Sequence, residues 1–176
     1  KIASGKGYWV ANPYFSDGSK FYAWRSPGFP IFLAIIYKIF GHSYLAAKVG
    51  LAILSSLTSI LLYFLGKILV DKKTGFWSAL VYSIYPASIF WSGYLAPVTL
   101  ETFLMCGFIL FLFLGEKNKN LIYWVISGIF LGLGILTRSL FIVFLPLLFI
   151  YLLLKEKKKF LKHFIIIFIT SFIIVL

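Results

Sequence analysis

Residues 44–66 form an apolar run of 23 residues in which Lys48 is the only charge. A helix needs about 20 consecutive apolar residues to cross a bilayer core, so this run is long enough to span a membrane. Lys48 lies near one end, from which its side chain can reach the headgroups. Because 61% of the chain is hydrophobic and only 12% is charged, an ordinary soluble domain is excluded. We therefore predict an all-α fold, a polytopic transmembrane helical bundle.

Two further apolar stretches are too long to be single spans. Residues 75–114 contain one charge, Glu101, and residues 121–154 contain one charge, Arg138. At the helical rise of 1.5 Å per residue they would measure about 60 Å and about 51 Å, against a hydrocarbon core of about 30 Å. Each stretch is therefore predicted to form a hairpin. The predicted spans are 44–66, 75–92, 98–114, 121–136, 139–154 and 161–176.

The first 29 residues lack a sustained apolar period and are rich in Gly, Ser, Asn and Pro, which predicts a loop outside the bilayer core. Residues 30–40 are apolar, but as a helix they would reach only about 17 Å and could not span. Pro30 suits the first helical turn, and Gly41 suits the stop. We predict an extracytoplasmic loop over 1–29, a short interfacial helix over 30–41 and a transmembrane bundle over 44–176.

The basic residues are predicted to set the orientation in the membrane. The chain has 17 Lys and Arg against 5 Asp and Glu, and ten of the 17 fall within 67–73, 117–119 and 155–162. Because Lys and Arg accumulate in cytoplasmic loops, these three loops are predicted inside, and the hairpin tips and the first loop outside. We expect a multi-pass protein of the cell membrane. No nucleic-acid partner is expected, because a nucleic-acid protein would not interleave its charge with such long apolar runs.

Three charged residues on the predicted outer face are candidates for chemistry, since ionisable groups at membrane depth are costly. Glu101 lies one turn into a helix that Pro97 can start; alternatively, it is an interfacial carboxylate stabilised by the positive helix end. Arg138 runs against the charge bias and needs a partner, either Glu101 or a phosphate; alternatively, it anchors to lipid phosphate. Arg25 precedes a stiff proline-containing run, and it too can contact lipid phosphates.

No metal and no cofactor is expected. His42 and His163 fall on opposite predicted faces, so they cannot share a metal. Cys106 lies within an apolar run and is predicted to be a small buried hydrophobe. Gly128 and Gly132 form a small-xxx-small pair, which predicts close helix packing. Aromatic residues near the predicted span ends are interpreted as an interfacial belt, namely Tyr82, Tyr85, Trp91, Tyr94, Tyr123 and Trp124.

The order of motifs resembles the multi-spanning GT-C glycosyltransferases, in particular the group of protein O-mannosyltransferases and lipid A aminoarabinose transferase. The resemblance covers nearly the whole chain. It is carried by IASGKG, by SPGFP running into FLAIIYKIFG, by SYLAAKVGLAILSSLTSILLYFLGKIL, by SALVYSIYPASIFWSGYL and by GIFLGLGILTRSLF. The passage from PGFP to KIFG and the LTR step are its more specific parts.

The resemblance implies an inverting sugar transfer from a polyprenyl-phosphate-linked donor to a lipid, glycan or protein acceptor on the extracytoplasmic face. In such enzymes a loop carboxylate is the general base, and cations stabilise the charge that develops on the lipid phosphate. By resemblance the base is an Asp upstream of Lys1, so we expect the chain to be an inactive N-terminal-half fragment. Arg138 and Arg25 would bind the donor phosphate. Glu101 would be either a possible catalytic residue that accepts a proton or the partner of Arg138. Asp17 does not match the family's acidic position.

A different class of function stays open, a non-catalytic polytopic membrane protein such as a lipid-linked-sugar transporter or an assembly subunit. A transporter would need polar residues along a path through its spans. Here the ionisable residues of the apolar stretches gather on one predicted face, which favours an enzyme with its site at that face.

Overall fold

The computed structural model describes residues 9–11, 20–22, 26–155 and 160–176. Its helices form a bundle, which confirms the predicted all-α class. A short antiparallel hairpin precedes the bundle, with β1 (Trp9–Ala11) paired to β2 (Lys20–Tyr22) so that Val10 lies opposite Phe21. This hairpin was not predicted, because strands of three residues are too short to show an alternating pattern.

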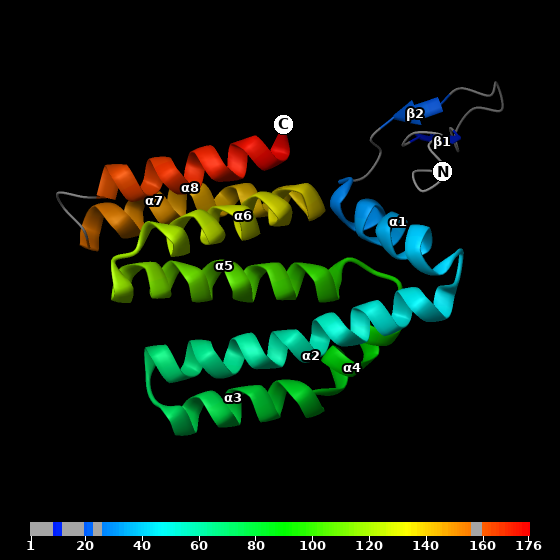
Figure 1. Ribbon diagram of the computed structural model, residues 1–176, viewed down its shortest axis with the longest axis horizontal. Helices are drawn as coiled ribbons and strands as arrows, with labels where there is room; N and C mark the ends of the chain where they lie inside the picture. Colours follow the sequence, from blue (N-terminus) through cyan, green and yellow to red (C-terminus); the bar gives the residue numbers. More distant parts are fainter. Residues whose placement is uncertain (1–8, 12–19, 23–25, 156–159) are drawn as a thin grey trace.

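The helices pack in the order α3, α2, α5, α6, α8 and α7, and Figure 1 shows these six lying with their axes nearly parallel. The shorter helices α1 and α4 lie at one end of this bundle. The elements are α1 (Gly28–Phe40), α2 (Tyr44–Leu69), α3 (Lys72–Ile84), α4 (Pro86–Gly93), α5 (Val98–Asn118), α6 (Leu121–Thr137), the 3-10 helix η1 (Ser139–Val143), α7 (Phe144–Lys155) and α8 (Phe160–Val175).

Two helices of the described part, α2 and α5, are long and apolar enough to cross a membrane by length and composition. Helix α2 begins at Tyr44, where the apolar run begins, because the Ser43 hydroxyl accepts a hydrogen bond from the backbone N–H of Ala46 and caps the first turn. Helices α1 and α6, the segment from η1 through α7, and α8 are apolar but shorter.

One predicted span, 75–92, is two helices in the structure. Helix α3 ends at Ile84, Tyr85 is extended with ψ 121°, and Pro86 starts α4. The cause is Pro86, which lacks an N–H and disfavours helical geometry in the residue before it. The Ser88 hydroxyl lies 2.6 Å from the carbonyl oxygen of Tyr82 and 2.7 Å from that of Tyr85, so it can donate a hydrogen bond to either carbonyl at the break.

A second difference lies after Arg138, where the predicted helix 139–154 begins as the 3-10 turn η1 before it becomes α7. In this turn the ring of Phe141 packs directly on Gly134 of α6, in space that a Cβ at residue 134 would occupy. The turn therefore folds back onto α6, and the chain reverses direction within a few residues.

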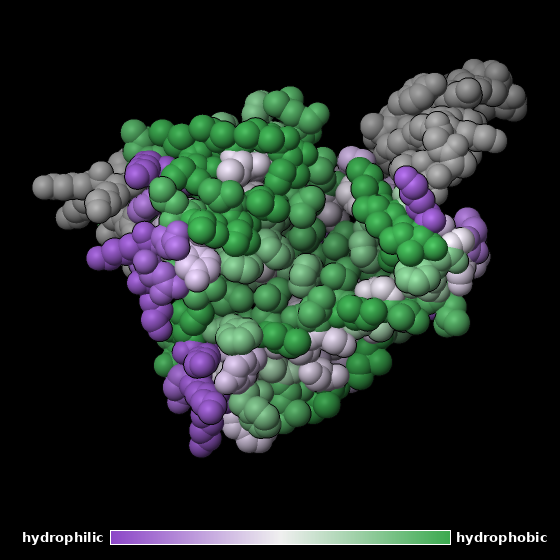
Figure 2. Space-filling view, viewed as in Figure 1, coloured by the Kyte–Doolittle hydropathy of each residue, from purple (hydrophilic) through white to green (hydrophobic). Residues whose placement is uncertain are grey.

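The described parts of the three basic loops lie at one end of the bundle, as predicted. The turn between α2 and α3, the turn between α5 and α6, and the start of α8 all lie there (Figure 1), and hydrophilic side chains cluster at the same end (Figure 2). At this end Asp71 caps α3 by accepting from the N–H of Thr74 at 2.7 Å. Hydrogen bonds from the side chain and then the backbone of Thr74 hold the pKa of Asp71 below its usual value. Between the two ends, the surface is apolar, as expected of a protein whose sides face lipid.

Glycines bring α6 close to its neighbours, which confirms the predicted small-xxx-small packing. Gly128 lies against Thr170 of α8, and a Cβ at Gly132 would lie 2.9 Å from the carbonyl oxygen of Ser171. The interpretation of Trp124 as an interfacial residue is wrong: it is fully buried in the bundle core and stacks on His163, with ring centroids 4.3 Å apart.

Candidate functional site

Glu101 and Arg138 form an ion pair, with Nη1 of Arg138 3.0 Å from Oε2 of Glu101. Glu101 lies in the first turn of α5, and Arg138 directly follows the last residue of α6. Because α5 and α6 are consecutive helices that pack side by side in opposite directions, the start of one meets the end of the other. The structure thus brings together two residues that are 37 positions apart in the chain.

Each charge also suits the helix end on which it lies. The backbone N–H of Glu101 donates to the carbonyl of Pro97 at 2.8 Å, and the N–H of Arg138 donates to the carbonyl of Gly134 at 2.8 Å. A carboxylate is stabilised at the positive N-terminal end of a helix, and a guanidinium at the negative C-terminal end. The pair is therefore held by two helix dipoles as well as by its own attraction.

The two partners differ in exposure. The side chain of Arg138 is 53% exposed, whereas that of Glu101 is 13% exposed. A guanidinium has five N–H donors, and within the described residues one of them bonds to Glu101. The covered carboxylate orients Arg138, while the exposed part of the guanidinium can bind an anion. This arrangement is suited to a phosphate, which arginine binds with short, charge-assisted hydrogen bonds.

A cavity of about 340 Å³ opens beneath the ion pair. Its polar lining is Glu101, Thr102 and Arg138, and the rest of the lining is largely apolar. An amphiphile with an anionic group and a hydrocarbon chain would match both parts. The remaining lining residues are Met105, Cys106, Leu140, Phe141 and Phe144.

Sequence reasoning missed this lining. Cys106, predicted to be a small buried hydrophobe, is only partly buried and faces the cavity. The sequence did contain a signal for the part of the lining on α5. Residues 101 and 105 are four apart, as are 102 and 106, so all four lie on one face of a helix. The contributions of Phe141 and Phe144 were not available, because they depend on the turn at η1.

The interfacial helix is anchored beside the ion pair. Gly28, the first residue of α1, packs against the end of α6, where a Cβ at residue 28 would lie 2.6 Å from Oγ1 of Thr137 and 2.7 Å from its backbone nitrogen. Thr137 immediately precedes Arg138, so the SPGFP run is held next to the pair. Arg25 and Asp17, the other residues considered in the sequence analysis, lie outside the described residues.

Metal ligands do not cluster in the part of the chain that the structure describes, where no group of three or more His, Cys, Asp and Glu residues comes together. His42 stacks on Tyr37 with ring centroids 4.6 Å apart, in the turn between α1 and α2. His163 lies near the start of α8, at the other end of the bundle. The described residues therefore include a half-exposed guanidinium at Arg138 and no assembled set of metal ligands.

A comparison with known protein families finds one whose model matches residues 24–176, described as dolichyl-phosphate-mannose-protein mannosyltransferase. The match includes both members of the ion pair, the whole of α1 and the residues before it from Trp24. No curated protein and no solved structure matches the chain.

Proposed function

Because the chain belongs to the dolichyl-phosphate-mannose-protein mannosyltransferase family of membrane glycosyltransferases, we propose that it takes part in sugar transfer from a polyprenyl-phosphate-linked donor to an acceptor hydroxyl. The acceptor is a lipid, a glycan or a protein, and the transfer takes place on the extracytoplasmic face of the cell membrane. The face is inferred from the basic loops, which lie at the end of the bundle opposite the ion pair.

The observation that carries this proposal is the exposed guanidinium of Arg138 at the mouth of a largely apolar cavity. A polyprenyl-phosphate sugar has the same two parts, an anionic phosphate and a hydrocarbon chain. The phosphate would bind the free N–H groups of Arg138, and the first part of the chain would lie against Phe141 and Phe144. Arg25 is the second cation that we propose for the phosphate.

The reaction makes clear why a cation is needed. The acceptor oxygen forms a bond to the anomeric carbon of the sugar, the bond from that carbon to the phosphate oxygen breaks, and the acceptor proton passes to a carboxylate base. The phosphate changes from a diester to a monoester and gains negative charge as it leaves. A guanidinium fixed beside it therefore stabilises the transition state more than the bound donor, which is the condition for catalysis. The resemblance implies an Asp as this base.

We assign Glu101 as the positioning partner of Arg138. Its carboxylate is largely covered and is bonded to the guanidinium, so it holds the cation in place. A general base must reach the acceptor proton directly or through one water, and a carboxylate already paired with Arg138 is poorly placed for that step.

Glu101→Gln tests this assignment. The amide keeps the shape and one hydrogen-bond acceptor but loses the charge, so we expect the KM for the donor to rise roughly 5- to 10-fold, as for the weakening of one charge-assisted bond by about 1–1.5 kcal/mol. The pH profile of kcat should keep its acidic limb, because the base is another residue. A loss of that limb together with a fall in kcat of more than about 10²-fold would instead identify Glu101 as the base.

The donor class is tested with the complete protein in proteoliposomes. Labelled polyprenyl-phosphate mannose is compared with labelled nucleotide mannose, and the release of polyprenyl phosphate is followed with and without acceptor. We expect release from the lipid-linked donor alone. Transfer from the nucleotide sugar would contradict the proposal, and movement of intact donor across the membrane without cleavage would favour the non-catalytic transporter.

A further inference from the structure

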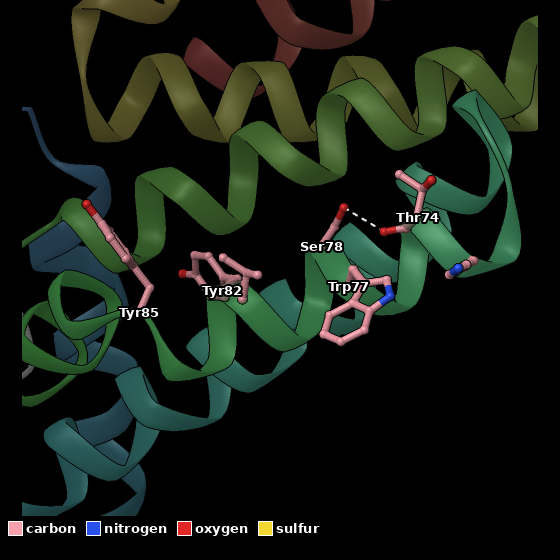
Figure 3. A pocket seen from close by; sticks show the side chains of 7 residues that line it. Thr74, Trp77, Ser78, Tyr82 and Tyr85 are labelled. Carbon is pink, nitrogen blue, oxygen red and sulfur yellow. Dashed lines mark hydrogen bonds between the residues drawn. The ribbon is translucent and has the colours of Figure 1, made fainter.

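A second and larger cavity, about 700 Å³, lies along α3 and shares no lining residue with the cavity at the ion pair. Figure 3 shows its lining side chains in succession along this helix, from Thr74 near one end to Tyr85 just beyond the other. The residues that line it are Lys73, Thr74, Trp77, Ser78, Val81, Tyr82 and Tyr85. The proposed glycosyl transfer uses none of them.

The lining forms two rows, because residues four apart stack on one face of a helix. The outer row is large and exposed, and it consists of Lys73, Trp77, Val81 and Tyr85. The inner row begins with two small residues, Thr74 and Ser78, whose hydroxyl and carbonyl are joined by a 2.8 Å hydrogen bond from Ser78 Oγ to Thr74 O. Small side chains beside large ones leave an open groove along the helix.

The length of the groove matches one leaflet of a bilayer. From Lys73 to Tyr85 the helical rise is about 18 Å, against about 15 Å for half of the hydrocarbon core. Lys73 lies at the basic end of the bundle, and Trp77 lies one turn deeper. An amine at the membrane surface with an indole just below it is the usual arrangement at headgroup level.

We propose that this groove binds one anionic phospholipid from the leaflet at the basic end of the bundle. Its phosphate contacts Lys73, one acyl chain lies along the groove, and the indole of Trp77 packs beside the glycerol region. The charge selects an anionic headgroup, because Lys73 lines the groove and Lys72, also exposed, precedes it in the chain. The acid nearest to them in sequence, Asp71, is engaged by Thr74 in capping α3.

The shape of the groove favours a lipid chain over a protein helix. Membrane helices pack closely where small residues face outward, as α6 and α8 do here through Gly128 and Gly132. Along α3 the outward row is instead Lys73, Trp77 and Val81, which are large side chains. A single flexible hydrocarbon chain can fill such a groove, whereas a second helix would be held away by the tryptophan.

Native mass spectrometry of the complete protein tests the proposal, with phosphatidylglycerol and phosphatidylcholine as probes. We expect the wild-type protein to retain one phosphatidylglycerol in preference to phosphatidylcholine. Lys73→Gln should lower that retention about five-fold, the factor for one lysine at an anionic membrane surface. The matched control is Lys117→Gln, an exposed lysine of another loop at the same end, which should behave like wild type. Equal retention by the two variants would overturn the proposal.

The position of the lipid is tested by fluorescence in nanodiscs that contain phosphatidylglycerol brominated on its acyl chains. We expect quenching of a component that Trp77→Phe removes, with much weaker quenching by brominated phosphatidylcholine. Ser78→Phe fills the floor of the groove and should abolish the difference between the two lipids. Undiminished lipid selectivity in Ser78→Phe, or displacement of the lipid by a polyprenyl phosphate or by a second copy of the chain, would show a different occupant.

Discussion

Replacing Arg138 with alanine is expected to lower sugar transfer by about 10²- to 10³-fold, the loss typical of removing one group that stabilises transition-state charge. The reason is local. The guanidinium is half exposed at the cavity mouth and has N–H donors beyond the one that binds Glu101. Expression and membrane insertion should be unchanged, because Arg138 packs little of its side chain in the core. Turnover of polyprenyl-phosphate mannose by the complete protein is the measurement.

Two further variants make the Arg138 result specific. Arg138→Lys keeps the charge but loses the forked donors, so it should recover part of the activity. Lys38→Ala removes an exposed cation from α1, at the same end of the bundle, and should have little effect. Full activity in Arg138→Ala, or an equal loss in Lys38→Ala, would show that the anion binds elsewhere.

The second large effect is expected from Gly28→Ala, a change of one methyl group. A Cβ at this position would lie 2.7 Å from the backbone nitrogen of Thr137 and 2.8 Å from the carbonyl carbon of Leu136. Backbone atoms at the end of α6 cannot rotate away, so α1 must shift. Overpacking of this kind costs about 1–3 kcal/mol of folding stability. Because misplacement by about 1 Å can cost about 10² in rate, we expect kcat to fall roughly 10- to 100-fold.

The matched control for Gly28→Ala is Gly93→Ala at the end of α4, where a Cβ would meet no atom within 4 Å. This variant should keep wild-type activity and thermal stability. The two are compared by turnover and by the midpoint of thermal unfolding in detergent. Wild-type turnover in Gly28→Ala would mean that α1 does not position the site.

The sequence predicted well those features that depend on length and charge. The start of α2 was predicted from the start of the apolar run at residue 44, and the gathering of the basic loops at one end follows from the spacing of the hairpins. The Arg138–Glu101 pair was one of the partners considered for Arg138, because an isolated charge at membrane depth is costly. Each of these features depends either on the properties of a single chain segment or on the high cost of leaving a charge unpaired in the membrane.

Features that depend on packing between segments could not be predicted. Trp124 has the residue type and the place near a helix end that are typical of an interfacial residue, yet the neighbouring helix α8 covers it and His163 stacks on it. The lining of the cavity depends on the 3-10 turn at η1, which brings Phe141 onto Gly134. The break at Tyr85 had a local signal in Pro86, but a proline inside an apolar run is also compatible with a kinked single helix.

The glycine contacts of α6 have a consequence for how the family can vary in evolution. Gly128 and Gly132 hold α8, Gly134 holds the Phe141 turn, and the end of the helix holds Gly28 of α1. None of these contacts has room for an added methyl group. Together they join α6 to α8, to the Phe141 turn and to α1. Helix α6 should therefore tolerate few substitutions at these glycines, and substitutions that diversify the protein should accumulate instead at exposed positions of α2 and α7.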